Sequence, residues 1–154
     1  MAGWILTMPI DTKWQGRFIK LAEEVATWSK DPSSQVGAVI VRTDKTIASV
    51  GFNGFPRKVK DDAFAIENRA TKLLRTIHAE LNAILSAKEP LIGYSLFVYP
   101  FQPCSNCAAA IIQSGITEVY CPYNAHLDSY DRWKVSFQEA LYMFDEANVR
   151  VIFS

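Results

Sequence analysis

Residues 36–41 read Val-Gly-Ala-Val-Ile-Val, an almost unbroken run of apolar side chains. A β-strand of this composition needs cover on both faces, which is typical of an inner strand of an α/β sheet. A polar turn at 43–46 follows, and a second strand is expected over residues 47–52, which makes the pair a hairpin. Helices on both sides of the sheet would give the chain three layers.

The rest of the sequence alternates between helical and strand patterns. Apolar residues recur at three- and four-residue steps between Trp14 and Trp28, which predicts a first helix. Further helices are expected over 79–88, 104–113 and 133–147, a partly helical stretch over 63–74, and strands over 96–99, 118–121 and 149–153. The later strand–helix–strand units require parallel pairing through right-handed crossovers. We therefore predict one domain over residues 1–154, an α/β fold with an α/β/α sandwich around a five-stranded mixed sheet.

Charge and composition limit the partners of the chain. It has 16 basic and 16 acidic residues among 154, so its formal net charge is zero. A binder of long nucleic acids normally carries a strongly basic face, so a small substrate is favoured over a nucleic-acid polymer. The apolar run 4–10 is too short to span a membrane and lacks the basic flank of a signal peptide. Three cysteines suit a reducing compartment better than a disulfide framework, so we expect a cytoplasmic protein.

Two short motifs carry the residues best suited to chemistry, His78-Ala79-Glu80 and Pro103-Cys104-Ser105-Asn106-Cys107. Each opens a predicted helix, where free backbone N–H groups and the helix dipole favour thiolates. Cys104 and Cys107 lie three positions apart, so both sulfurs can bind one ion, with His78 as a third ligand. Three protein ligands with one open position are the arrangement of a catalytic zinc site.

Glu80 could supply the proton transfers that a catalytic zinc site needs. The pattern H-x-E followed by P-C-x-x-C is that of zinc nucleobase deaminases. Zinc lowers the pKa of bound water from about 16 to roughly 7, and the resulting hydroxide can add to a ring carbon that bears an amino group. Glu80 would take the water proton, protonate the ring nitrogen and then protonate the departing amine.

A closed structural zinc site is the alternative. It would use four residues with the spacing C-x2-C-x13-C-x4-H: Cys104, Cys107, Cys121 and His126. The chain would then be a non-enzymatic, zinc-stabilised binding module. That reading leaves Glu80 without a role, and Cys121 at the end of a predicted strand is more simply a core residue.

With three further blocks, the chain resembles the deoxycytidylate (dCMP) deaminases of the cytidine-deaminase superfamily. The blocks are Ser29-Lys30-Asp31-Pro32, then Gly51-Phe52-Asn53-Gly54-Phe55-Pro56-Arg57, then Asp61-Asp62. The resemblance implies a cytidine-deaminase-like fold and the zinc-dependent hydrolysis of dCMP to dUMP and ammonia, which supplies dUMP for dTMP synthesis. Cytidine or deoxycytidine is the nearest alternative substrate, followed by other nucleobases.

The resemblance also implies residue roles, with His78, Cys104 and Cys107 as zinc ligands and Glu80 as proton shuttle. Asn53 would hydrogen-bond a sugar hydroxyl, unless it serves only as a turn residue, and the Ala79 backbone would read the pyrimidine. A 5′-phosphate needs cations or N–H donors, for which Lys30 and Arg57 are candidates. Tyr123 would cover the base or phosphate, or else pack as a core aromatic.

Regulation and assembly are further implications of the resemblance. They include a homo-oligomer, with a hexamer favoured, activation by dCTP, and inhibition by dTTP with Mg²⁺. Regulatory contacts are expected near Gly54, Phe55, Arg57 and Lys58. Residues 55–77 contain no Cys or His, so a second zinc is not expected there. Tyr99-Pro100-Phe101-Gln102 stands where Thr-Leu is common in the family, which would alter the shape of the pocket.

Overall fold

A mixed sheet of five strands organises the computed structural model, which describes residues 8–124 and 130–154. The strands are β1 (Gly37–Val41), β2 (Ile47–Phe52), β3 (Ser95–Tyr99), β4 (Glu118–Cys121) and β5 (Arg150–Phe153). They lie in the order β2-β1-β3-β4-β5. Pairing is antiparallel from β2 to β3 and parallel from β3 to β5. The predicted five-stranded mixed sheet is confirmed.

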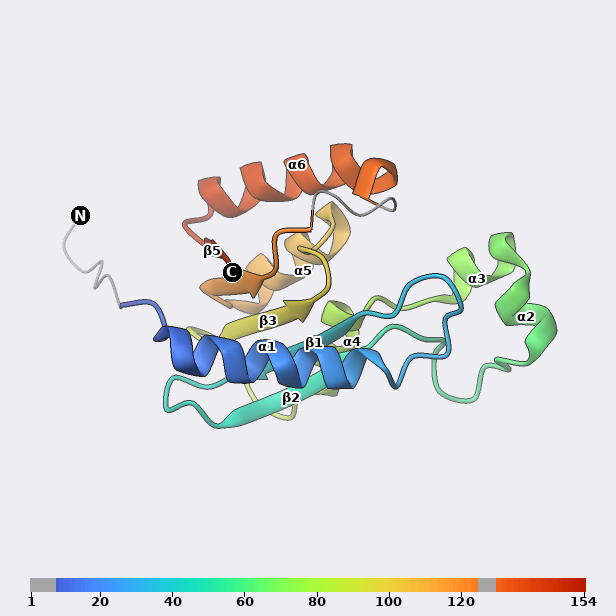
Figure 1. Cartoon of the computed structure of the whole chain (residues 1–154), viewed down its shortest axis with the longest axis horizontal. Helices are drawn as coiled ribbons and strands as arrows, with labels where there is room; N and C mark the ends of the chain where they lie inside the picture. Colours follow the sequence, from blue (N-terminus) through green and yellow to red (C-terminus); the bar gives the residue numbers. More distant parts are fainter. Residues whose placement is uncertain (1–7, 125–129) are drawn as a thin grey trace.

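The helices within the described residues are α1 (Thr12–Ala26), α2 (Ala63–Glu67), α3 (Arg69–Arg75), α4 (Ala79–Ser86), α5 (Ser105–Ser114) and α6 (Tyr130–Glu146). Four of the helices described form the two outer layers, and α2 and α3 lie at one end of the molecule (Figure 1). Helix α1 packs on one face of the sheet, and α4, α5 and α6 pack on the other. None of these helices is long and apolar enough to cross a bilayer.

The apolar run in β1 explains why both faces of the sheet are covered. All five of its residues are buried. Ala38 and Ile40 belong to the core cluster beneath α4, α5 and α6, whereas Val39 and Val41 belong to the cluster beneath α1. Successive side chains of a strand point to opposite faces, so this composition specifies an inner strand of a three-layer fold.

A glycine in β2 allows α4 to lie directly against the sheet. A Cβ atom on Gly51 would lie 2.3 Å from the backbone nitrogen of Ala83 and 2.5 Å from the carbonyl oxygen of Ala79. We expect Gly51→Ala to lower the free energy of unfolding by about 1–3 kcal/mol, because α4 must shift, and urea titration measures this. Gly16→Ala, at an exposed position of α1, is the control, since its Cβ would meet nothing within 4 Å. Equal stability of the two variants would contradict this packing.

Candidate active site

The three predicted metal ligands meet where α4 and α5 begin. His78 is the N-cap residue of α4, and Cys104 is the N-cap residue of α5. The Nδ1 atom of His78 lies 3.4 Å from the Sγ atom of Cys104 and 3.4 Å from that of Cys107. Tetrahedral zinc with Zn–S of about 2.3 Å and Zn–N of about 2.0 Å separates nitrogen from sulfur by about 3.5 Å. The donor set and its spacing therefore fit zinc.

The electrostatics of this cluster favour a thiolate. Hydrogen bonds with the Cys107 thiol and the His78 imidazole lower the pKa of Cys104 to about 4. The hydrogen bond with Cys104 raises the pKa of Cys107, so the two sulfurs share one proton. A hydrogen bond with Cys104 also raises the pKa of His78. Zinc binds thiolates and neutral imidazole, so metal binding would release the remaining protons.

Glu80 lies beside these ligands in the first turn of α4. Only 4% of its surface is exposed, and it lines the same pocket as His78 and Cys104. Burial raises the pKa of Glu80 to about 7, and the charge of Cys104 adds to the rise. A carboxyl group that titrates near neutrality can accept a proton and return it. The arrangement joins a metal-ligand set to an acid–base group in one pocket.

The pocket wall includes residues that the sequence analysis did not select. Arg69 and Lys72 come from α3, and Arg132 and Trp133 come from α6. The Trp133 ring meets the His78 ring edge-on, with 5.9 Å between the ring centroids. Their positions depend on how α3 and α6 pack over the ligands, which no local motif signals.

Asn53 and Ala79, two of the predicted substrate contacts, line this pocket. Asn53 is buried, and its amide already holds the neighbouring loop. Its Nδ2 donates to the carbonyl oxygen of Ser34 at 2.8 Å, and its Oδ1 accepts from the backbone N–H of Val36 at 2.9 Å. Ala79 is the first residue of α4, so its N–H has no partner within the helix.

The other predicted substrate contacts lie elsewhere. Lys30 forms an exposed ion pair with Asp61 at 2.8 Å, and Arg57 is exposed. Tyr123 packs edge-on against Phe153, with 5.7 Å between the ring centroids, and is 64% exposed. None of Lys30, Arg57 and Tyr123 is among the residues that line the pocket. Phe101 and Gln102, from the segment that departs from the family pattern, do line it.

The four-ligand alternative receives no geometric support. Cys121 is fully buried in the core cluster, and burial raises its pKa to about 12. In the described part of the chain, the cluster able to hold a metal consists of His78, Cys104 and Cys107, without Cys121. His126 lies outside the described residues.

A second hollow adjoins the active-site pocket. Its lining includes Gly54 and Phe55, two of the predicted regulatory residues, together with Trp28 and Phe52. Arg57 and Lys58 do not line it. The two hollows share four residues of their walls: Asp31, Asn53, Lys72 and Thr76.

Comparison with known proteins places this site in a family. Residues 12–122 match the model of the cytidine and deoxycytidylate deaminase zinc-binding region. The chain belongs to this deaminase family. It is 51% identical over 140 residues to an uncharacterized deaminase in the luxG 3′ region of Aliivibrio fischeri, covering 91% of this chain and 92% of that one.

A relative with an assigned substrate supports this family, and a solved structure supports the fold. Deoxycytidylate deaminase of Mus musculus is 42% identical over 123 residues, which are 76% of this chain and 68% of that one. The apo dCMP deaminase of the cyanophage S-TIM5 superposes with a TM-score of 0.74 at 22% identity, over 94% of this chain and all of that one. This superposition confirms the predicted cytidine-deaminase-like fold.

Proposed function

We propose that this chain is a zinc-dependent enzyme that hydrolyses dCMP to dUMP and ammonia. The observation that carries the proposal is a catalytic-type ligand set, His78, Cys104 and Cys107, with buried Glu80 in the same pocket. Deoxycytidylate deaminases of mouse and human, at 42% and 41% identity, support dCMP as the substrate. Zinc-loaded protein incubated with dCMP should yield dUMP and ammonia in equal amounts, and absence of both products would refute the proposal.

Different residues of the chain would perform the separate steps of this hydrolysis. When bound, zinc supplies an activated water as the nucleophile for the amino-bearing ring carbon. Glu80 accepts one proton from the water and delivers it to the ring nitrogen, then takes the second proton from the oxygen now bonded to the ring carbon and delivers it to the departing amine. We propose that the N–H of Ala79, which has no partner within α4, donates to the base. The ring carbon gains oxygen and loses its nitrogen as ammonia, so atoms balance.

Asn53 is our proposed contact for the sugar. Of the two hydrogen bonds from its side chain to the loop, one uses an amide hydrogen on Nδ2 and the other uses a lone pair on Oδ1. One hydrogen on Nδ2 and one lone pair on Oδ1 remain, enough to donate to and accept from a hydroxyl group. The loop bonds fix the orientation of the amide before the substrate arrives.

Arg69 and Arg132 are better placed for the substrate phosphate than Lys30 and Arg57. Both arginines line the pocket. Neither forms an ion pair with any residue in the described ranges. A guanidinium can hold phosphate through two parallel hydrogen bonds. We propose that these two side chains distinguish the nucleotide from the nucleoside.

Arg69→Gln and Arg132→Gln are each expected to raise KM for dCMP by about ten- to a hundredfold, because each removes a charged hydrogen bond. Their kcat/KM for deoxycytidine, which lacks phosphate, should stay unchanged. Steady-state ammonia release measures both. Arg17→Gln, exposed on α1, is the control, and Arg57→Gln tests the residue chosen from sequence. If Arg57→Gln raised KM for dCMP and the two pocket variants did not, the assignment to Arg69 and Arg132 would be overturned.

We also propose that the second hollow binds a regulatory nucleotide, dCTP as activator and dTTP with Mg²⁺ as inhibitor. Its aromatic lining by Trp28, Phe52 and Phe55 suits a nucleobase. A rate that does not respond to either triphosphate would remove this proposal and leave the reaction intact.

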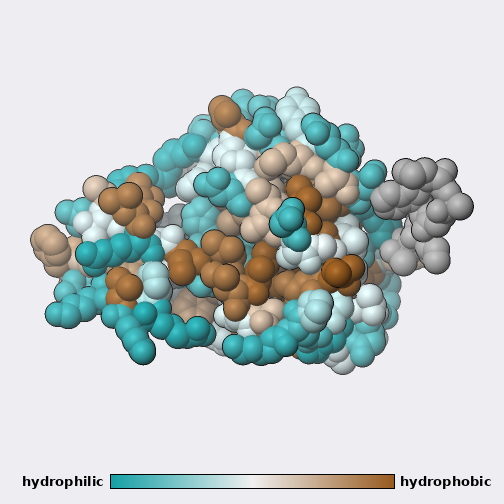
Figure 2. Space-filling model, turned by 180° about the vertical axis from the view of Figure 1, so that it is seen from behind, coloured by the Kyte–Doolittle hydropathy of each residue, from teal (hydrophilic) through white to brown (hydrophobic). Residues whose placement is uncertain are grey.

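A homo-oligomer, with a hexamer favoured, is proposed from the surface. Apolar side chains gather across the middle of the face opposite α1 (Figure 2). Leu85 of α4 and Ile92 are among the exposed apolar residues, at 63% and 76%. Contiguous apolar surface of this kind marks protein contacts. Sedimentation equilibrium tests the stoichiometry, and a monomer at micromolar concentration would refute it.

A further inference from the structure

Helices α2 and α3 have no apolar core of their own, and α3 forms one wall of the pocket. They lie at one end of the molecule, beyond the end of the sheet (Figure 1). In the part of the chain that the structure describes, neither helix contributes to the two core clusters. Phe64, Leu73 and Leu74 are 77%, 55% and 88% exposed. Apolar burial therefore contributes little to holding this wall in place.

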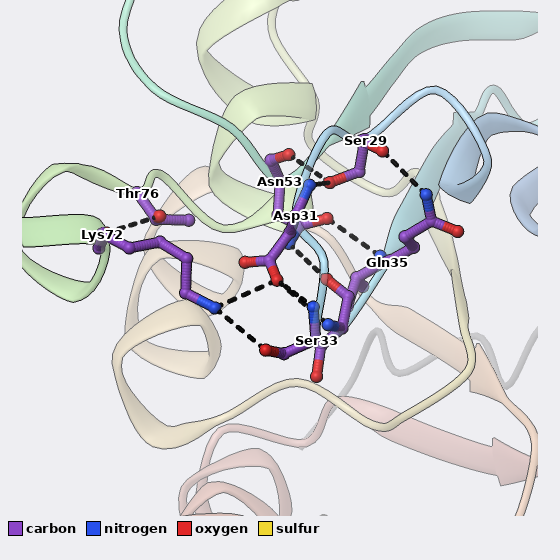
Figure 3. Close-up of polar contacts among 9 residues, drawn as sticks. Ser29, Asp31, Ser33, Gln35, Asn53, Lys72 and Thr76 are labelled. Atoms are coloured by element: carbon purple, nitrogen blue, oxygen red, sulfur yellow. Dashed lines mark hydrogen bonds and ion pairs between the residues drawn. The ribbon is translucent and has the colours of Figure 1, made fainter. Parts of the chain in front are cut away.

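The residue that α3 does bury is a lysine. Lys72 is its single buried member, with 8% of the side chain exposed. Its Nζ lies 3.1 Å from Oδ1 of Asp31, whose side chain is 11% exposed, and 3.3 Å from Oγ of Ser33. Figure 3 shows the Lys72 side chain reaching from α3 to Asp31 and Ser33, which belong to the loop between α1 and β1. A buried cation of this kind is retained only with a partner, because an unpaired buried charge is costly.

Asp31 connects this ion pair to Asn53 through the loop between α1 and β1. The same Oδ1 atom accepts the backbone N–H groups of Ser33 at 2.8 Å and Ser34 at 3.0 Å. The carbonyl oxygen of Ser34 then accepts from Nδ2 of Asn53. Ser29 completes the connection, since its Oγ donates to the carbonyl oxygen of Asn53 at 2.8 Å. One loop therefore joins α3 to the proposed sugar contact (Figure 3).

The charge state of the pair agrees with this geometry. Burial alone would raise the pKa of Asp31, but hydrogen bonds from the backbone of Ser34 and Ser33 and from Lys72 outweigh it and lower the pKa. The carboxylate therefore stays charged at neutral pH. Asp31 and Lys72 lie between the active-site pocket and the second hollow, because both residues line each of them.

We propose that Asp31 and Lys72 form a clasp that holds α3 against the Asn53 loop, and that Lys72 is a positioning residue for substrate binding. Without the clasp, α3 would move away from the loop, and Arg69 and Asn53 would lose their fixed separation. The metal ligands lie on α4 and α5 and would be unaffected. The clasp rests on the proposed function, because its kinetic readout is the turnover of dCMP.

Lys72→Met tests the clasp with a side chain of similar length and no charge. We expect KM for dCMP to rise by about ten- to a hundredfold, since a displacement near 1 Å costs up to about a hundredfold, with a smaller change in kcat. Zinc content should stay at that of the wild type. Hydrogen exchange of the amides in 63–76 should accelerate in the absence of substrate. Lys45→Met, whose exposed partner Asp11 lies 4.0 Å away, is the matched control and should change neither readout.

A double variant separates positioning from general stability. Lys72→Met alone leaves Asp31 as a buried charge without its lysine, which destabilises the fold. In Asp31→Asn/Lys72→Met that charge is gone, and the asparagine Oδ1 can still accept the Ser33 and Ser34 N–H groups. We expect the thermal midpoint to return toward the wild-type value while KM and hydrogen exchange stay at the Lys72→Met values. Recovery of KM together with stability would reduce Lys72 to a purely structural residue and overturn the proposal.

The outcomes also distinguish the clasp from a direct role of Lys72 in phosphate binding and from a failure of the proposed function. A raised KM with unchanged hydrogen exchange in 63–76 would make Lys72 a direct phosphate ligand and contradict the clasp. If the wild-type protein does not deaminate dCMP, the proposed function fails. The exchange experiment would then still test whether Lys72 holds α3.

Discussion

Cys107→Ser is expected to remove zinc and reduce dCMP deamination to background. Cys107 is 3% exposed and lies 3.4 Å from the Nδ1 atom of His78, so its loss leaves two of the three ligands. Two ligands do not retain zinc against a mild chelator, and metal binding is coupled to folding. Metal analysis of the purified variant, with ammonia release from dCMP, measures both effects.

Cys121→Ala is the matched control for this loss. Cys121 is as deeply buried as Cys107 but does not belong to the metal-binding cluster. The variant should retain zinc and turnover and lose stability through a small cavity. Loss of zinc from Cys121→Ala would restore the four-ligand structural site and contradict the catalytic one.

Glu80→Gln is expected to lower kcat for dCMP by about 10²–10⁴-fold. The amide has nearly the shape of the carboxyl group, and it cannot exchange protons with water, ring nitrogen and amine. The ligands on α4 and α5 are unchanged, so zinc content should match that of the wild type. Single-turnover measurements on zinc-loaded protein separate the chemical step from product release. An unchanged rate would show that another group moves the protons.

The fold was predictable because its pattern is local. The run in β1 is apolar at every position, so it demanded cover on both faces, and the helices and strands lie close to their predicted ranges. The stretch 63–74 was less predictable, since it holds two helices divided at Asn68. The Asn68 backbone is extended, and its side chain caps α3 by accepting the N–H of Thr71. One residue serves as the end of one helix and the cap of the next, which periodicity alone does not reveal.

The cluster of candidate metal ligands was predictable for the same reason, whereas the pocket wall was not. Each cysteine and the histidine stand in a short motif at a helix start. Lys72 and Asp31 are 41 positions apart, and a lysine in a polar segment ordinarily reads as exposed. Arg132 reaches the pocket only because α6 packs over α5. Long-range packing places these residues, and the sequence pattern contains no signal for it.

The most direct test of the account is the relative kcat/KM of zinc-loaded protein for dCMP, CMP, deoxycytidine and cytidine, with ammonia and the deaminated product both quantified. Arg69 and Arg132 at the pocket predict a preference for the phosphorylated compounds, and the family relatives predict dCMP before CMP. We expect dCMP to have the highest value and to yield one dUMP for each ammonia. Equal or faster turnover of deoxycytidine or cytidine would contradict the assignment and make the chain a nucleoside deaminase.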